Sequence, residues 1–265
     1  SPWKPVQVVV GKMKNPFVTS DILWDSDLNP EGIALLASKE YWNTKFFVRS
    51  GFFVIDEYEN SANDPYFYAM QAGLEREVFG RKLTLAIAAY DFRQIKGKDI
   101  EDISPDYLKK TNSLVNYKDS KGIERNKFRY DFTLLDAYLN YELYSFECGE
   151  KNYPLSFEGH FIRNIAEDVK DRDALLAAIT LGKNKEKGDW SLRYSWRKIE
   201  KDAVLGIFND ATFHAGGTNT QGHGLSWNYL LHKNASLGLN YFDAREIKGT
   251  DDRVRTFYCD FQVKF

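Results

Sequence analysis

The sequence predicts an all-β protein, a transmembrane antiparallel β-barrel with about twelve strands in this chain. Three observations predict it. Apolar and polar residues alternate along most of the chain, as in strands with one face in lipid and the other in a wet lumen. Aromatic residues make up 15% of 265 residues, although the mean hydropathy is only −0.50. The connections between predicted strands alternate between short and long, as in outer-membrane barrels.

Composition excludes several other classes. With 36 basic and 38 acidic side chains, the formal charge is −2, so no nucleic-acid partner is expected. No apolar run approaches the roughly 18 residues that a spanning helix needs, which excludes a helical membrane protein. Two cysteines cannot form a disulfide framework, and no metal site is expected around them. Residues 1–5 have no secretory signal pattern, so we expect such a signal to be absent or removed.

The predicted strands follow one another along the whole chain as a single domain, residues 1–265. The last four show the alternation most clearly: in the final strand Phe257 and Phe261 share one face, and Tyr258 and Asp260 share the other. The earlier strands continue the same period. The predicted strands are 6–13, 32–40, 45–57, 66–78, 81–92, 130–146, 153–164, 173–183, 190–198, 223–233, 235–246 and 254–265.

The connections carry independent information. Long ones, at 14–31, 93–129 and 199–222, alternate with short ones such as 79–80 and 233–234. A soluble β-sandwich, the alternative fold, gives no reason for that alternation, whereas outer-membrane barrels pair short periplasmic turns with long external loops. Aromatic residues also gather near the predicted strand ends, as in two interfacial girdles. These residues are Tyr41, Trp42, Phe79, Phe146, Tyr153, Trp190 and Phe265 on the short-turn side, and Tyr58, Tyr66, Phe92 and Tyr130 on the other.

Two consecutive segments resemble the characteristic stretch of a bacterial outer-membrane family, the "putative porin" family. They are GKMKNPF at 11–17 and LWDSDLNPEG at 23–32, and the specific match covers roughly 6–37. The resemblance implies a porin barrel in a Gram-negative outer membrane, and the terminal Phe265 resembles the insertion signal of such barrels. Because the family usually carries further strands upstream, two architectures stay open: a twelve-stranded barrel, or the C-terminal part of a sixteen-stranded one.

The loop at 14–31 is the first candidate site. Under the sixteen-strand alternative it would be the third external loop, which folds inward to narrow the pore in general porins. Its acidic side chains could attract cations at a constriction. The predicted constriction residues are Asp21, Asp25, Asp27 and Glu31. An EF-hand reading of this loop fails, because Pro30 stands where a calcium loop needs glycine.

Charged residues of both signs are predicted to face the lumen, because along each strand they share the face opposite to the lipid-facing residues. The predicted pore-lining residues are Arg49, Lys82, Arg193 and Arg197, with Asp136, Glu142, Glu158 and Asp260. A wall of mixed sign can set a transverse field across a channel. We expect the pair Arg193 and Arg197 to oppose the acidic loop. The alternative is that these arginines pair with neighbouring carboxylates such as Glu158 and only satisfy a polar interior.

The function expected from these features is passive diffusion of ions and small hydrophilic solutes, without a cofactor. Expected partners are outer-membrane lipid and lipopolysaccharide, and a homotrimer is one assembly to test. A barrel with a blocked lumen, acting as a scaffold or adhesin through loops 93–129 and 199–222, is the alternative. A barrel hydrolase is a weaker one, because its only grouping, His214, His223 and Ser226, resembles no hydrolase signature; we predict no enzyme.

Overall fold

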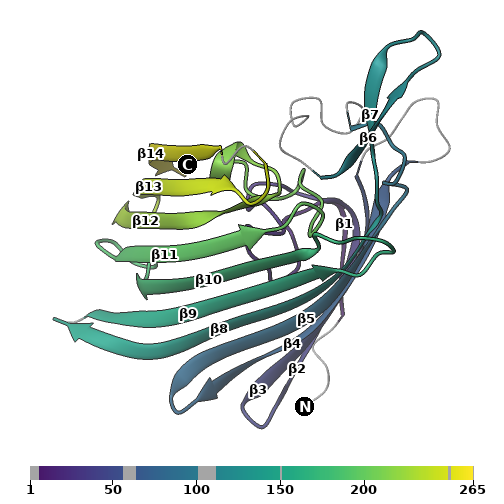
Figure 1. Ribbon diagram of the computed structural model, residues 1–265. Coiled ribbons are helices and arrows are strands. Elements are labelled where there is room, and N and C mark those ends of the chain that lie inside the picture. The colour runs from purple at the N-terminus through teal and green to yellow at the C-terminus, as the bar shows by residue number, and fades with distance from the viewer. Residues whose placement is uncertain (1–5, 56–63, 101–111, 150, 250–251, 265) are drawn as a thin grey trace.

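A computed structural model describes residues 6–55, 64–100, 112–149, 151–249 and 252–264. Twelve strands form one antiparallel sheet that curves around two inward-folded loops (Figure 1). The order is β1-β2-β3-β4-β5-β8-β9-β10-β11-β12-β13-β14, so each strand pairs with its neighbours along the chain except across β6 and β7. The bounds are β1 Gln7–Lys12, β2 Glu31–Tyr41, β3 Thr44–Val54, β4 Tyr66–Val78, β5 Arg81–Arg93, β8 Phe132–Cys148, β9 Lys151–Asn164, β10 Asp173–Gly182, β11 Trp190–Ile199, β12 Thr220–His232, β13 Ala235–Glu246 and β14 Arg253–Val263.

All twelve predicted strands are confirmed, with boundaries shifted by a few residues. The structure adds a hairpin that the sequence analysis missed: β6 (Leu114–Lys118) pairs with β7 (Glu124–Phe128) inside the long connection 93–129 (Figure 1). Asp119 begins its turn and accepts backbone N–H bonds from Lys121 and Ile123 at 2.8 and 2.9 Å. The predicted aromatic positions Tyr58 and Phe265 lie outside the described residues.

Short turns join the strands at one end of the sheet. At two of them both central residues have positive φ, as a type I′ hairpin turn requires: Trp42 and Asn43 at 46° and 54°, and Phe79 and Gly80 at 53° and 72°. Trp42 and Phe79 are 80% and 94% exposed there. These side chains match the predicted aromatic girdle at the short-turn end, where an amphipathic ring suits a membrane interface.

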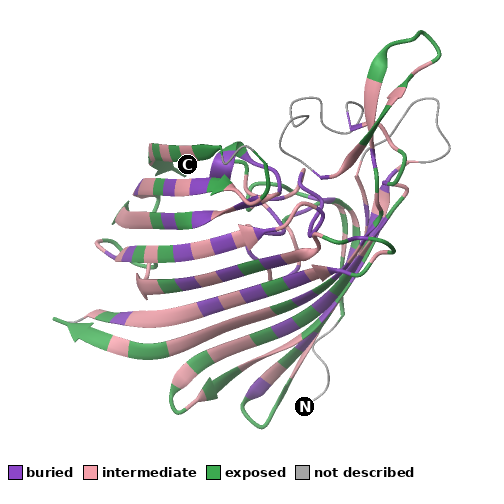
Figure 2. Cartoon of the chain, in the orientation of Figure 1, coloured by how far each residue is buried: buried purple, intermediate pink, exposed green. Residues whose placement is uncertain are grey.

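Burial alternates along the strands, as Figure 2 shows. The outward face is apolar: Phe257 and Phe261 of β14 are 69% and 65% exposed. The inward face differs from the prediction, because it is open and polar only at the short-turn end. At the long-loop end it is covered and largely apolar, with buried polar residues such as Asp136, His160 and Arg197 beside a packed core. Phe92 lies in that core and is 1% exposed, so its predicted place in the outer girdle is wrong.

That inner core packs the two loops against the inward face of the sheet. Inward aromatic rings of three adjacent strands stack, with centroids 4.9 Å apart for Phe53 and Phe67 and 5.0 Å for Phe67 and Phe92. Loop residues cover them, which removes their surface from water. None of the helices in the described ranges is long and apolar enough to cross a membrane. Strands β1 and β14 end the sheet order, so the choice between twelve and sixteen strands stays a prediction.

Candidate functional site

Two loops fold onto the inward face of the sheet. We call residues 13–30 the first inner loop and residues 200–219 the second inner loop. Strand side chains bind the first one through its backbone: Arg49 donates to the Pro16 carbonyl at 2.6 Å. Gln71 donates to the Val18 carbonyl and accepts from the Val18 N–H, both at 2.8 Å. The predicted inward fold of loop 14–31 therefore matches the described geometry.

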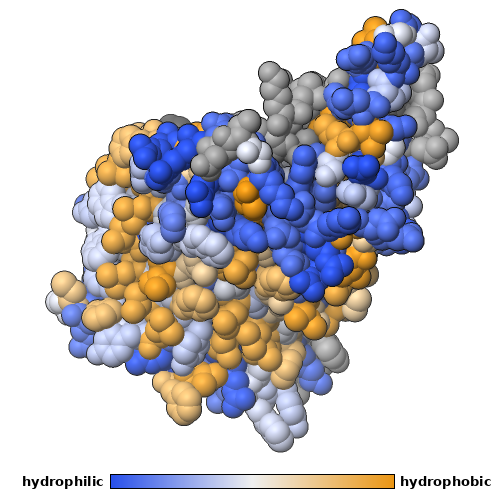
Figure 3. All heavy atoms as spheres, viewed as in Figure 1, coloured by the Kyte–Doolittle hydropathy of each residue, from blue (hydrophilic) through white to orange (hydrophobic). Residues whose placement is uncertain are grey.

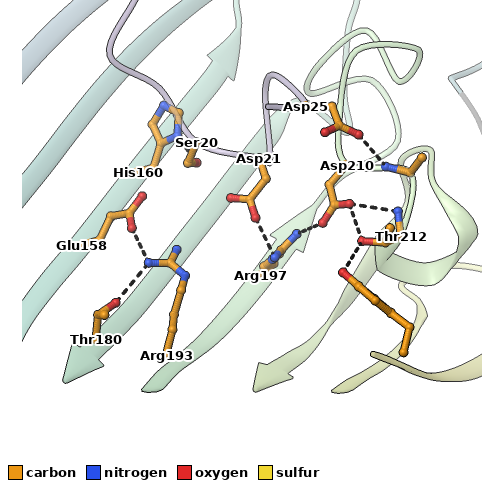
Figure 4. Close-up of polar contacts among 12 residues, drawn as sticks. Ser20, Asp21, Asp25, Glu158, His160, Thr180, Arg193, Arg197, Asp210 and Thr212 are labelled. Carbon is orange, nitrogen blue, oxygen red and sulfur yellow. Dashed lines mark hydrogen bonds and ion pairs between the residues drawn. The ribbon is translucent and has the colours of Figure 1, made fainter. Parts of the chain in front are cut away.

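Arg197 of β11 joins both inner loops (Figure 4). Its guanidinium lies 2.8 Å from Asp21 of the first inner loop and 2.8 Å from Asp210 of the second. Phe213 and Phe242 flank it, with ring centroids 4.7 and 5.3 Å from Cζ. Because Arg197 is only 3% exposed, one buried cation holds two carboxylates from separate loops. Arg197 was predicted to line the pore opposite the acidic loop. It does meet that loop, through a direct ion pair with Asp21, but the pairing buries Arg197 and does not leave it exposed on the pore wall.

The two inner loops also bind each other. Trp24 stacks on Phe208, with centroids 4.6 Å apart and planes 14° from parallel. The Asp25 N–H donates to the Phe208 carbonyl at 2.6 Å, and the Asp210 N–H donates to the Asp21 carbonyl at 3.0 Å. The loops therefore form one unit inside the lumen, not two independent covers.

A buried hydrogen-bonded chain fixes the first inner loop to β9 and β8. Ser20 Oγ lies 2.6 Å from His160 Nδ1, and His160 Nε2 lies 2.8 Å from Asp136 Oδ2. Asp136 was predicted to line the pore; it does face inward, but it is 4% exposed beneath the loop. Its position suits an anchor for the loop better than a contact for a passing solute.

Arg193 of β11 pairs with a neighbouring carboxylate, which is the second of the two arrangements that the sequence left open. It binds Glu158 of β9 at 2.5 Å and reaches Thr180 Oγ1 at 3.4 Å (Figure 4). The pair borders a recess of about 510 Å³ beside the first inner loop, also lined by Lys14, Asp21 and Ser26. The side chain of Arg193 is 25% exposed, so two cations, Lys14 and Arg193, and two anions, Asp21 and Glu158, line this space together.

The other three predicted constriction residues, Asp25, Asp27 and Glu31, all lie in the described part of the chain and do not form ion pairs with Arg193 or Arg197 as Asp21 does with Arg197. Asp27 and Glu31 are exposed. Asp25 accepts from the Ala211 N–H at 3.3 Å, and burial together with the charges of Asp27 and Asp210 raises the pKa of its carboxyl. Burial alone would also raise the pKa of Asp21, but the positive charges of Arg197 and Arg193 outweigh it and hold that pKa below its usual value.

The other predicted wall residues lie nearer the short turns or on the last strand. Lys82 pairs with Glu77 in the β4–β5 register, and both line a recess of about 380 Å³ together with Lys45 and Glu75. Glu142 lies beside a bulge in the β8–β9 pairing. Asp260 accepts from Asn240 Nδ2 at 3.1 Å. The inward face at this end is therefore charged, of both signs, and open.

The structure does not assemble the hydrolase grouping. Ser226 pairs in register with Arg193 and shares its inward face, whereas His223, three residues away, is on the opposite face and contacts Tyr194 at 2.7 Å. His214 lies in the second inner loop and contacts the Asp252 carbonyl at 2.9 Å. Within the described part of the chain, no group of three or more His, Cys, Asp or Glu side chains is placed to hold a metal ion.

Sequence reasoning missed the second inner loop as part of the site. It placed loop 199–222 outside, yet Phe208 and Asp210 lie inside against the first inner loop. One signal was present: Ala203-Val204-Leu205-Gly206-Ile207-Phe208 is an apolar run in a segment with no strand period. Such a run would be costly to expose to water, so it indicates inward packing.

The family described as "Putative porin" matches residues 2–265, which is nearly the whole chain. No curated protein matches the chain.

Proposed function

The chain belongs to this porin family, and we propose that it is an outer-membrane channel through which ions and small hydrophilic solutes diffuse passively. The observation that carries the proposal is the pair of inner loops, which Arg197 clamps inside the lumen of a strongly curved sheet. A lumen narrowed at one end and open at the other is what size-limited diffusion needs. Passive diffusion needs no catalysis and no cofactor.

The route past the inner loops would follow the charged recess between the first inner loop and β9 to β11. There Lys14, Asp21, Glu158 and Arg193 face a space of about 510 Å³. Contacts with both signs of charge would replace part of the hydration shell of a small polar solute. Ion preference would follow the net charge along the whole route, from the open end to the narrowest point.

One observation favours a second candidate, a barrel with a blocked lumen that acts as a scaffold or adhesin. The long-loop end of the inward face is a packed core that includes both inner loops. If no route remains past that core, the surface loops would carry the function.

Single-channel recording in a planar bilayer separates the two candidates. The protein would be refolded in detergent and recorded with different salt concentrations on the two sides. We expect regular open steps, and the sign of the reversal potential would give the ion preference; steps in groups of three would indicate a homotrimer. Silence from protein shown to be folded would contradict the channel and support the blocked barrel.

A further inference from the structure

The recess beside the first inner loop brings charges of both signs together on the inward face of the sheet. On the outside, Figure 3 shows hydrophobic residues over the strands and hydrophilic ones gathered toward the end where β6 and β7 project. Inside, the charged residues that line the recess are Lys14 and Asp21 of the first inner loop, Glu158 of β9 and Arg193 of β11. Two cations and two anions give this lining a formal charge of zero.

The recess has the size of a small-molecule site, and its cations keep N–H donors for a ligand. Its volume of about 510 Å³ lies within the range of about 300–1,000 Å³ that is usual for such sites. Within the described residues, Arg193 donates to Glu158 and Thr180 from Nη1 alone, so Nε and Nη2 remain for a ligand (Figure 4). Lys14 is exposed, and no carboxylate in the described ranges pairs with it.

The two carboxylates of the recess also keep acceptor capacity for a ligand. Asp21 binds Arg197 through Oδ2, and Glu158 binds Arg193 through Oε2. An ionised carboxylate has about four lone-pair sites on its two oxygens, so each can accept a further hydrogen bond. The side chains of Asp21 and Glu158 are 34% and 11% exposed. The existing ion pairs can therefore stay intact while a ligand binds beside them.

We propose that this recess binds small zwitterions of the amino-acid type. The carboxylate of the solute lies against Lys14 and Arg193, which can bind it through charge-assisted hydrogen bonds. The ammonium group lies against Asp21 and Glu158. A simple ion is attracted by one pair of wall charges and repelled by the other, so a neutral lining gives it no net advantage, whereas a zwitterion presents an opposite charge to each pair. The inference names the solute class of the proposed channel and rests on that proposed function.

The test measures binding and passage separately, with solutes of nearly equal size. Alanine is a zwitterion, lactamide is its uncharged isomer, and lactate and alaninamide carry the negative and the positive charge alone. Saturation-transfer NMR of the refolded protein in detergent would measure the binding of each solute. Swelling of liposomes that contain the protein would compare the passage of alanine and lactamide.

Three variants of the refolded chain complete the test. Lys14→Gln with Arg193→Gln removes both cations of the recess, and Glu158→Gln removes one of its anions. Lys118→Gln with Lys121→Gln is the matched control, because it removes the same charge from exposed positions on the β6–β7 hairpin. Urea unfolding would establish that each variant is folded.

We expect the unmodified chain to bind alanine at least about tenfold more tightly than lactamide and to pass alanine faster. The variant without Lys14 and Arg193 should lose this preference, and the hairpin variant should keep it. Glu158→Gln should bind lactate more tightly than alanine, because the lining is then positive.

Equal binding of alanine and lactamide by the unmodified chain, tighter binding of lactate or alaninamide, or equal loss in both double variants would each overturn the proposal. Equal passage of alanine and lactamide without preferential binding would overturn the zwitterion site and leave the channel intact. Preferential binding of alanine without passage of any solute would contradict the proposed channel alone.

Discussion

The two ends of the lumen-facing surface are built from the same alternating strands, but one end is covered by the inner loops and the other is open. At the long-loop end, inward side chains such as Phe53, Phe67 and Leu134 are at most 1% exposed beneath the inner loops. At the short-turn end, the pair Lys45 and Glu75 keeps side-chain exposures of 37% and 41%. Alternation therefore assigns a residue to a face, but the cover over that face decides whether it becomes core or wall.

Because of this difference, we expect the two ends to contribute differently to stability and to ion preference. The covered end depends on packing and buried charge pairs, so substitutions there should change loop position and stability. The open end depends on solvated charges, so substitutions there should change ion preference and little else.

The largest effect is expected for Arg197→Gln. It removes the cation shared by Asp21 and Asp210 and leaves their carboxylates without it, which should lower the free energy of unfolding by about 3–5 kcal/mol. Urea unfolding of the refolded protein would measure the loss, and limited proteolysis should show new cleavage within residues 13–30 and 200–219. The matched control, Arg193→Gln, removes a more exposed cation and should cost less. Equal losses in both variants would contradict the clamp.

The next effect is expected for Trp24→Ala. Trp24 is 5% exposed and stacks on Phe208, so its truncation leaves a cavity between the inner loops and should cost about 3 kcal/mol. Trp42→Ala is the control, because that ring is 80% exposed in a turn. The same urea titration compares the two variants. A Trp24 variant as stable as the Trp42 variant would show that the inner loops do not depend on this contact.

The sequence could predict the strands because alternation is local. It could predict that Asp21 and Arg197 oppose each other, because parity and an inward loop place them on one side. It could not predict Asp210 as the second partner, since the two carboxylates are 189 residues apart in the chain and meet only through the fold of both loops. It also placed Phe92 in a girdle, because parity near a strand end does not reveal whether a loop covers the ring.

Acid should loosen the covered end only at low pH. The pKa of Asp21 lies below its ordinary value because Arg197 and Arg193 favour the charged form despite burial. A depressed pKa contributes stability above the unfolded value of about 3.9, and that contribution is lost as the pH falls through the folded value. Asp25, whose pKa is raised, loses its charge first and with it the repulsion from Asp27 and Asp210.

Protease cleavage within residues 13–30 should therefore stay constant from pH 7 to about 5 and rise only below about 4. An acid-active protease keeps the measurement possible over the lower range. In the Asp21→Asn variant the rise should disappear, because the group that titrates is gone. A rise that already begins near pH 6 would contradict the assignment to Asp21.

The smallest effect on stability is expected at the open end, for Glu75→Gln with Glu77→Gln. The side chain of Glu75 is 41% exposed and its ion pair with Lys45 is solvated, so the free energy of unfolding should change by less than about 1 kcal/mol. Both glutamates line the same recess as Lys45 and Lys82, so their neutralisation leaves that recess positive. The reversal potential in a salt gradient should therefore shift toward anions, whereas Glu124→Gln on the β7 hairpin should not shift it. An unchanged reversal potential would mean that ion preference is set only where the inner loops narrow the lumen, and that the open end is merely a vestibule.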